Sequence, residues 1–253
     1  MTTLLLDIGN SRLKWGLLNN DRIGATGHVS LQNIEQRGVA ALASLLPPRF
    51  DTVLACNVAG AGIGTLLSEL GDVRFAKPTT KACGVTNGYR NPEHLGVDRW
   101  AAMIGARAAT SSACLVVDAG TAITLDALDP RGVHLGGQIM PGLRLMSESL
   151  GCSTSDLPLV NTNTLVIDPD ASPFATSTND AIAKGILGAV AGSIERSLQF
   201  LRAAKADVDV DVILTGGDAA IIQHHLHQAT ELRPHLVLEG LACLASVSEQ
   251  RSA

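Results

Sequence analysis

The chain is poor in aromatic residues and in positive charge. Only 3% of its 253 residues are aromatic, too few for the stacking platforms of proteins that bind single-stranded nucleic acid. The formal net charge of −5 offers no basic surface, so an anionic ligand would have to meet a local group of donors, cations or helix ends. The composition therefore argues against a nucleic-acid partner.

Cysteine clusters and long apolar runs are also missing. The cysteines are scattered, odd in number and never in C-x-x-C spacing, so we expect buried free thiols rather than a metal or redox site. They are Cys56, Cys83, Cys114, Cys152 and Cys243. No apolar stretch approaches the roughly 20 residues that a membrane helix needs, and the first residues lack the basic region of a signal peptide. We expect a cytoplasmic protein with no membrane partner.

What the sequence has is enough apolar material for proper cores and an order of elements that occurs twice. Hydrophobic residues make up 46% of the chain and charged residues 17%, which allows one large or two modest domains. Each half reads as three strands followed by alternating helices and strands. Later predictions in this order include a helix over 31–46, a third strand of the second half over 132–139, a helix ending near 227 and a strand over 235–238. The duplication predicts two like domains with a cleft between them.

Each half opens with the same hairpin pattern, LLLDIGNSRLKWGLLNN at 4–20 and LVVDAGTAITLDALDPR at 115–131. An apolar strand ends on an acid, Asp7 or Asp118, and a glycine two residues later opens a tight turn into a second strand. Such a tip presents backbone N–H groups and a carboxylate to a phosphate chain and its metal. One such match is weak, because any α/β protein contains hairpins. Two matches, each opening the same order of elements, predict a nucleotide clamp.

Other routes to phosphate binding are missing. The chain has no G-x-x-x-x-G-K-[ST] loop and no H-R-D or D-F-G set, which argues against P-loop and protein-kinase sites. The repeated D-[IA]-G-[NT]-[SA] pattern, with a late apolar strand ending in Leu214-Thr215-Gly216-Gly217-Asp218, resembles the superfamily of actin, sugar kinases and heat-shock chaperones. This resemblance implies an α/β fold of duplicated actin-like (ribonuclease H-like) domains, with mixed sheets flanked by helices and a central cleft. We place the domains at 1–112 and 113–253.

The most specific local sequence lies between the two hairpins, at 89–99, where YRNPEHLGVDR leads into a predicted helix. A G-x-D-R sequence at a helix N-terminus suits an acceptor that carries both a hydroxyl and a carboxylate. Asp98 can take the hydroxyl proton, and Arg99 with the helix-end N–H groups can donate to anionic or polar atoms. Because phosphoryl transfer demands little early deprotonation, we expect Asp98 chiefly to orient the nucleophile. The alternative is that Asp98 only favours the helix dipole and Arg99 is its surface partner.

Together with four further motifs, this segment resembles type III pantothenate kinase over nearly the whole chain. The motifs are Asp7-Ile8-Gly9-Asn10, Asp118-Ala119-Gly120-Thr121-Ala122, Gly136-Gly137-Gln138-Ile139-Met140-Pro141-Gly142 and Ser177-Thr178-Asn179-Asp180-Ala181-Ile182. The resemblance implies a phosphotransferase with an alcohol acceptor, which phosphorylates pantothenate with ATP to 4'-phosphopantothenate in the first step of coenzyme A biosynthesis. It also implies a homodimer whose substrate site is completed across the interface.

The resemblance assigns roles to individual residues. The proton acceptor would be Asp98, and the pantothenate pocket would comprise Tyr89, Gly96, Val97, Asp98, Arg99 and, from the partner subunit, Thr178. ATP with Mg²⁺ would bind Asp7, Ile8, Gly9, Asn10, Ser11, Arg12, Leu13, Lys14 and Thr121. Asp118 would organise a monovalent cation, K⁺ or NH₄⁺. The sequence departs from the family pattern at Ser177, where asparagine is more usual, which affects the geometry beside Thr178.

The hairpins differ in ways that indicate a division of labour. Asn10 and Lys14 in the first give way to Thr121 and Leu125 in the second, so we expect the first to face the polyphosphate and metal and the second to hold the monovalent cation. Lys14 has a simpler interpretation, because alternation of Arg12 and Lys14 with apolar neighbours is ordinary strand patterning.

Histidines and large apolar residues have mostly structural interpretations. The histidines at 224, 225 and 227 sit on a predicted helix without a partner acid at i+4, so we expect a solvated face rather than a metal site. His134 is an isolated polar residue on a predicted strand and reads as structural. Trp15, Trp100 and Met103 read as core.

Rival functions remain open. A sugar or amino-sugar kinase of the same superfamily would need longer substrate loops than this compact chain provides. A regulatory or assembly protein that binds ATP to change conformation predicts nucleotide binding without pantothenate-stimulated ADP release. A 2-hydroxyacyl dehydratase activator would need clustered cysteines for an iron–sulfur centre. Neither the charge nor a helix-turn-helix pattern supports a transcriptional role.

Overall fold

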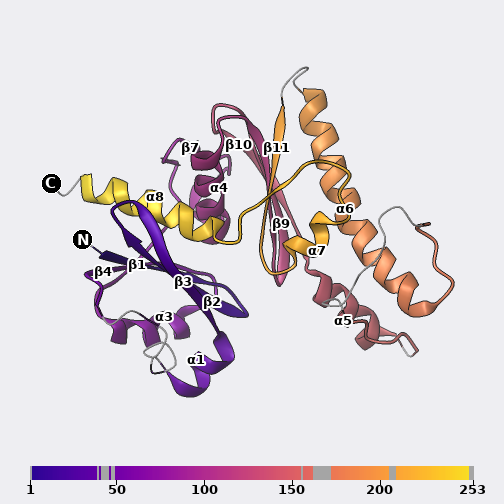
Figure 1. Cartoon of the computed structure of the whole chain (residues 1–253), viewed down its shortest axis with the longest axis horizontal. Coiled ribbons are helices and arrows are strands. Elements are labelled where there is room, and N and C mark those ends of the chain that lie inside the picture. The colour runs from indigo at the N-terminus through magenta and orange to yellow at the C-terminus, as the bar shows by residue number, and fades with distance from the viewer. Residues whose placement is uncertain are drawn as a thin grey trace. The chain divides into compact units, whose positions relative to one another are not determined.

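The computed structural model describes residues 2–38, 40, 46, 49–154, 156–161, 172–204 and 209–250, which fall into two compact units (Figure 1). The first unit comprises Met1–Ser111, Arg131–His134 and His235–Ala253, and the second comprises Ser112–Pro130 and Leu135–Pro234. These units are defined by packing, and the domain boundary expected near residue 112 stays a proposal.

Each unit is built on a five-stranded mixed sheet. In the first, β1 (Thr2–Ile8), β2 (Arg12–Asn19), β3 (Arg22–Ser30), β4 (Thr52–Asn57) and β5 (Val73–Phe75) take the order β3-β2-β1-β4-β5. In the second, β8 (Ala113–Ala119), β9 (Ala122–Leu128), β10 (His134–Pro141), β11 (Val210–Thr215) and β12 (Glu231–Leu232) take the order β10-β9-β8-β11-β12. The central strand of each sheet pairs antiparallel with the next strand and parallel with the fourth. The predicted duplication of strand order is confirmed.

Helices cover these sheets. The first unit contains α1 (Leu31–Arg37), α3 (Ala61–Leu67) with a 3₁₀ turn at Ser68–Leu70, α4 (Val97–Ala109) and α8 (Leu236–Gln250), together with the short hairpin of β6 (Lys81–Ala82) and β7 (Val85–Thr86) and a 3₁₀ turn at Pro92–His94. The second contains α5 (Leu143–Ser153), α6 (Thr178–Ala204) and α7 (Ala219–Gln223). No helix in the described ranges is long and apolar enough to cross a membrane.

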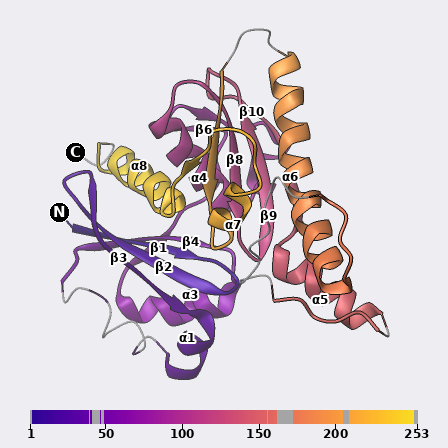
Figure 2. The ribbon, with the colours of Figure 1, turned by 45° about the vertical axis from the view of Figure 1, so that its right-hand side comes forward.

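The first sheet is covered on both faces, which explains the continuous apolar run of its central strand. Leu4, Leu5 and Leu6 are all fully buried. Alternate residues of β1 pack into a core with Ile34 of α1 and Leu67 of α3 on one face. Helix α8 contacts the sheet from the other face (Figure 2). Strand β1 therefore ends inside the unit, where Asp7, its last polar residue, is largely shielded from solvent.

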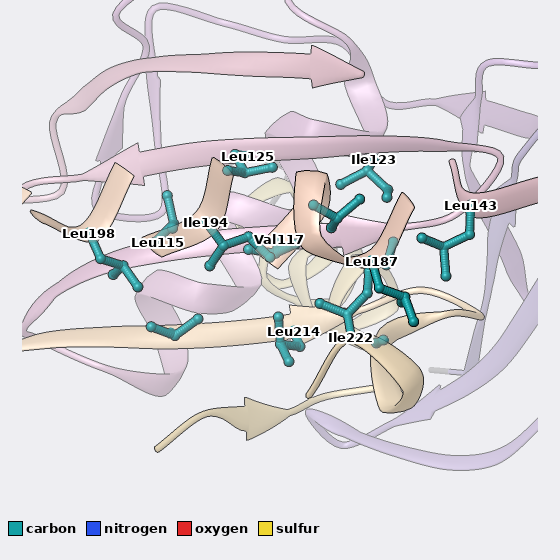
Figure 3. Close-up of a cluster of buried hydrophobic side chains, with 14 of the residues drawn as sticks. Leu115, Val117, Ile123, Leu125, Leu143, Leu187, Ile194, Leu198, Leu214 and Ile222 are labelled. Atoms are coloured by element: carbon teal, nitrogen blue, oxygen red, sulfur yellow. The ribbon is translucent and has the colours of Figure 1, made fainter. Parts of the chain in front are cut away.

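The core of the second unit is organised by one stripe of α6 (Figure 3). Its buried residues recur at four-residue intervals, which places them on one helix face: Ile182, Ile186, Val190, Ile194 and Leu198. This stripe packs on side chains of β8, β9 and β11, including Val117, Leu125 and Leu214. The opposite face of α6 is left outside the core.

Helices α4 and α8 approach each other until their backbones touch. A Cβ atom at Gly240 would lie 1.8 Å from the carbonyl oxygen of Ala101, and one at Gly105 would lie 2.4 Å from that of Leu236. Neither position leaves room for any side chain. Since α4 begins at the G-x-D-R sequence, this contact fixes the helix that carries Asp98.

Several predicted boundaries need correction. The strand expected over 235–238 is wrong, because these residues lead into and begin α8, and the edge strand is β12, which pairs with β11 instead. A short apolar run fits a strand or a buried helix equally well, and close packing on α4 decides for the helix. The helix expected to end near 227 ends at Gln223, and the strand expected from 132 starts at His134. Helix α1 ends at Arg37, before Gly38 at φ +61°, and most of the remaining predicted helix lies outside the described residues.

We predict that Gly240→Ala lowers the free energy of unfolding by about 1–3 kcal/mol, because overpacking forces α4 and α8 apart. Urea unfolding followed by circular dichroism measures this change. The matched control is Gly62→Ala on α3, where an added Cβ meets nothing within 4 Å. The control should raise stability by at most about 1 kcal/mol. If both variants unfold at the wild-type urea concentration, the close helix contact is wrong.

Candidate active site

The first hairpin places an acid opposite a lysine. Asp7 lies near the end of β1, with Lys14 directly opposite on β2 and Cys56 on β4. Directly opposite residues share one face of a sheet, so a cation faces the nearly buried carboxylate, which is 9% exposed. The turn occupies residues 9–11 and is closed by the Gly9 amide, which donates to the Arg12 carbonyl oxygen at 3.0 Å.

The predicted ATP residues of this hairpin differ in what they can offer. Asn10, Ser11 and Arg12 are exposed, so a ligand can reach their side chains. Ile8 and Leu13 are fully buried in the core, which leaves only their backbone groups for a ligand. The hairpin tip is therefore a mixture of backbone and short polar donors, as phosphate binding requires.

The second hairpin has a shorter turn. Its β8 ends at Ala119 and β9 begins at Ala122, and the Gly120 amide donates to the Ala122 carbonyl oxygen at 3.1 Å. Asp118 consequently lies opposite Thr124, which makes Thr124 the counterpart of Lys14. The match of Lys14 with Leu125 in the hairpin sequences is therefore wrong by one residue. The first hairpin has an ammonium opposite its acid and the second has a hydroxyl.

Backbone encloses the tip of this second hairpin. The Gly142 amide donates to the Thr121 carbonyl oxygen at 2.9 Å. A Cβ atom at Gly142 would lie 2.2 Å from the Gly120 oxygen and 2.6 Å from the Thr121 oxygen. One at Gly216, which has φ +97°, would lie within 2.6 Å of the Ala119 backbone. The carbonyl oxygens of Gly120 and Thr121 thus lie against Gly142, in the turn that follows Asp118. Oxygens of this hard kind are the ligands that alkali cations take in proteins.

The segment from Tyr89 to Arg99 is held by Asn87. The Asn87 side-chain oxygen accepts from the Tyr89 amide at 3.0 Å, and its amide nitrogen lies within hydrogen-bonding distance of the carbonyl oxygens of Thr79, at 3.3 Å, and Pro92, at 3.2 Å. Asn87 was not among the predicted site residues. Its Asn-Gly dipeptide with Gly88 is a turn signal that could have drawn attention to it.

Arg99 is buried, with 5% exposure, and its Nη1 donates to the Tyr89 hydroxyl at 2.7 Å. Its guanidinium carbon lies 5.5 Å from the centre of the Tyr89 ring, within the range of a cation–π interaction. These contacts do not fit the alternative in which Arg99 is a surface partner of Asp98. Tyr89 and Arg99, both predicted to line the pantothenate pocket, are therefore in direct contact.

Asp98 lies in the first turn of α4, whose N-cap is Gly96. Its Oδ1 accepts from the Arg99 amide at 2.8 Å, and the side chain is half-buried. A Cβ atom at Gly96 would lie 2.6 Å from this oxygen, so glycine is needed to leave the carboxylate in place. The N-terminus of α4 thus carries an oriented carboxylate, next to the half-buried Val97.

His134 has a contact that its pattern did not predict. Its side chain is 2% exposed and its ring stacks on that of Tyr89, with centroids 5.8 Å apart and an interplanar angle of 15°. Nothing in the local sequence signals this pair, because the two residues are far apart along the chain.

Thr178 is exposed at the first residue of α6. Ser177 before it lies within hydrogen-bonding distance of the Asp180 amide, at 3.3 Å, and donates its hydroxyl to the Asp180 carboxylate at 2.7 Å. This arrangement is a helix cap of the kind that serine and asparagine both make. The departure from the family pattern at Ser177 therefore keeps the start of α6 capped.

The histidines near α7 and the cysteines are the other candidates for a site among the described residues. His224, His225 and His227 lie in the turns that follow α7 rather than on a helix, and burial, then the neighbouring His224, lowers the pKa of His225. Within the described ranges, no group of His, Cys, Asp and Glu could hold a metal ion. All five cysteines are free, as predicted, although only Cys56 and Cys114 are buried and Cys152 is exposed. Burial is the main cause that raises the pKa of both Cys83 and Cys243, which keeps these thiols protonated and unreactive.

The paired units, each with the same mixed sheet and an acid at the end of its central strand, define a protein of the actin-like class. Solved structures of the same fold cover nearly the whole chain. A putative Baf family transcriptional activator from Campylobacter jejuni matches with a TM-score of 0.64 at 21% identity over 99% of this chain and 100% of its own. A putative 2-dehydro-3-deoxygalactonokinase from Sinorhizobium meliloti matches with a TM-score of 0.63 at 16% identity over 97% and 99%. At such identities the likeness concerns the fold alone.

Sequence comparison identifies the family. A family model described as type III pantothenate kinase matches residues 3–199. A type III pantothenate kinase from Alkalilimnicola ehrlichii is 40% identical over 97% of this chain and 98% of its own, and one from Dechloromonas aromatica is 40% identical over 95% and 97%. The chain belongs to the type III pantothenate kinase family, as the resemblance of its motifs predicted.

Proposed function

We propose that the protein transfers the γ-phosphoryl group of ATP to the terminal hydroxyl of pantothenate, giving 4'-phosphopantothenate in the first step of coenzyme A biosynthesis. The observation that carries the proposal is the cluster of Tyr89, Asp98 and Arg99 at the start of α4 in a member of this family. Its free thiols and its use of ATP fit the cytoplasm.

The acceptor end of the site follows from hydrogen-bonding roles. Arg99 donates to the Tyr89 hydroxyl, so the phenolic proton remains for an acceptor atom of the substrate, such as a carboxylate or amide oxygen. Asp98 accepts from the Arg99 amide with one oxygen, and we assign its carboxylate to the substrate hydroxyl. Asp98 would aim the nucleophile at phosphorus and take its proton late, because the transition state is loose. Gly96 and Val97 would complete this wall of the pocket.

The nucleotide end is assigned to the first hairpin. Kinases of this kind act on ATP with a divalent metal. The tip of β1 and β2 offers a carboxylate as a metal ligand, and its exposed polar side chains and turn amides can donate hydrogen bonds to phosphate oxygens. We assign residues 7–14 and Thr121 to ATP. The metal, when bound, offsets the charge of the polyphosphate. Lys14, opposite Asp7, would add a point charge at the same place.

We assign a monovalent cation, K⁺ or NH₄⁺, to Asp118 at the second hairpin. The support is the turn that follows Asp118, where the carbonyl oxygens of Gly120 and Thr121 lie close to one another against Gly142. Such carbonyl-rich sets replace the hydration shell of K⁺ in proteins. The residue opposite Asp118 is Thr124, whose hydroxyl adds an uncharged oxygen on the same face of the sheet.

We also propose a homodimer that uses the outer face of α6. Gly185, Gly188 and Gly192 carry nothing within 4 Å of an added Cβ, which leaves room for the backbone of a second helix. Nearby, Phe200 and Ile139 are 72% and 65% exposed, beside a cavity of about 420 Å³ lined by residues of α6 and β10. A second copy would cover these apolar groups and bring Thr178, exposed on the same helix, to the partner's acceptor pocket.

ADP release with and without pantothenate tests the proposed function. Wild-type protein should release ADP only when pantothenate is present, whereas a regulatory ATP-binding protein would ignore it and a sugar kinase would respond to a sugar instead. Asp98→Asn should lower kcat by about 10² to 10⁴ with little change in the KM for ATP, because the nucleophile is no longer oriented or deprotonated. Glu93→Gln, an exposed change in the same segment, is the control and should keep full activity. Full activity of the Asp98 variant would remove its assignment.

Turnover in potassium against sodium tests the cation site. We expect turnover in KCl and little in NaCl, and in Asp118→Asn the KCl concentration for half-activation should rise by about 10-fold or more, because one charged oxygen ligand is lost. Asp209→Asn, an exposed aspartate before β11, is the matched control. Equal rates in both salts would contradict the assignment of a potassium site.

A purified heterodimer tests whether Thr178 acts across an interface. Asp98→Asn and Thr178→Arg subunits, co-expressed with different tags, should each be inactive alone. In the heterodimer one of the paired sites would be intact, so about half of the wild-type activity should return. If Thr178 served the pocket of its own chain, both sites would carry a defect and the heterodimer would stay inactive.

A further inference from the structure

Residues 132–134 are docked by their backbone on the segment that precedes Tyr89. The Thr86 amide donates to the Gly132 carbonyl oxygen at 2.9 Å, and Thr86 forms an isolated parallel bridge with Val133. A Cβ atom at Gly88 would lie 1.8 Å from the His134 carbonyl oxygen. Such close backbone contact leaves His134 little freedom in where it begins β10.

From this position the His134 ring meets the Tyr89 ring. The ring centroids are 5.8 Å apart and nearly parallel at 15°, within the range of a favourable aromatic pair. His134 itself is buried, at 2% exposure, whereas Tyr89 is only half-buried and lies on a loop. The fixed member of the pair is therefore the histidine.

The Tyr89 side chain is thus held at two places. Its ring lies on His134, and its hydroxyl accepts from Arg99 Nη1 at 2.7 Å. The hydrogen bond sets how far the phenol reaches, and the stack sets the plane in which its remaining proton can point. A half-exposed tyrosine held only by its tip would lose this orientation.

We infer that His134 is a positioning residue of the acceptor pocket, which sets the ring of Tyr89 and through it the hydrogen bond to the substrate. This inference rests on the proposed assignment of Tyr89 to pantothenate. His134 touches no substrate in this account, so its effect should fall on acceptor binding and spare ATP.

Steady-state kinetics separates positioning from simple stability. In His134→Leu, which keeps apolar volume without the flat ring, the KM for pantothenate should rise about twofold to tenfold while kcat and the KM for ATP stay near wild type. His134→Phe keeps the aromatic face and should restore the wild-type KM. The matched control is His28→Leu, at an exposed histidine of β3. An unchanged KM in His134→Leu, or an equal defect in His134→Phe, would overturn the inference.

Tyr89 is the single tyrosine of the chain, which gives a direct probe of the stack. Protein labelled with 3-fluorotyrosine should show one folded ¹⁹F resonance, and loss of the adjacent ring in His134→Leu should move it. His28→Leu should leave it in place. An unmoved resonance in a folded His134→Leu protein would overturn the inference.

The two measurements also distinguish a failure of the proposed function from a failure of the inference about His134. A wild-type protein that does not phosphorylate pantothenate would overturn the proposed function. The ¹⁹F resonance of the ligand-free protein would still decide whether His134 sets the Tyr89 ring.

Discussion

The hydrogen bond from the buried Arg99 guanidinium to the Tyr89 hydroxyl joins the acceptor segment to the start of α4. A guanidinium at 5% exposure is costly to bury without partners, so the loop that supplies one is tied to the helix. The helix in turn is fixed by backbone contact with α8 at Gly105 and Gly240. The position of Asp98 thus depends on a chain of contacts that runs from the C-terminal helix to the loop.

The two units share one strand order, and local differences in their first hairpins give the hairpins different residues at corresponding positions. In both sheets the next-to-last residue of the central strand is an acid, and a glycine turn follows. The first turn is one residue longer, which brings Lys14 opposite Asp7, whereas Thr124 lies opposite Asp118. An ammonium beside a carboxylate that can hold a metal ion suits a polyphosphate, and a carboxylate next to a turn of carbonyl oxygens suits a monovalent cation. The unequal roles assigned to the hairpins follow from that difference.

Sequence patterns predicted the strand order and the family because both depend on local signals. The apolar strands that end on Asp7 and Asp118, and the G-x-D-R sequence at the start of α4, are confirmed as elements. The strand expected at 235–238 failed because its apolar run is compatible with either element, and the decisive contact, at Gly240, is made with a distant helix. Leu125, which the sequence pattern matches with Lys14, does not lie opposite Asp118, because a turn that is shorter by one residue shifts every pairing beyond it.

The stack of His134 on Tyr89 had no signal in the sequence, and the Asn87-Gly88 turn signal could have marked Asn87 but not the partners of its side chain. Each depends on partners that are set by the tertiary fold, and single histidines and asparagines occur in many settings. The residues assigned to ATP, to the cation and to the partner subunit are taken from the family pattern. The chemistry of their side chains fits each ligand.

In the proposed reaction the pocket at Asp98 presents the terminal hydroxyl of pantothenate to ATP. The most direct test is the proton-coupled ³¹P spectrum of the product made from these substrates. Transfer to the terminal hydroxyl gives a new phosphomonoester resonance that is split into a triplet by the two protons of the terminal carbon. A doublet, which would mark transfer to the secondary hydroxyl, or inorganic phosphate alone would contradict it.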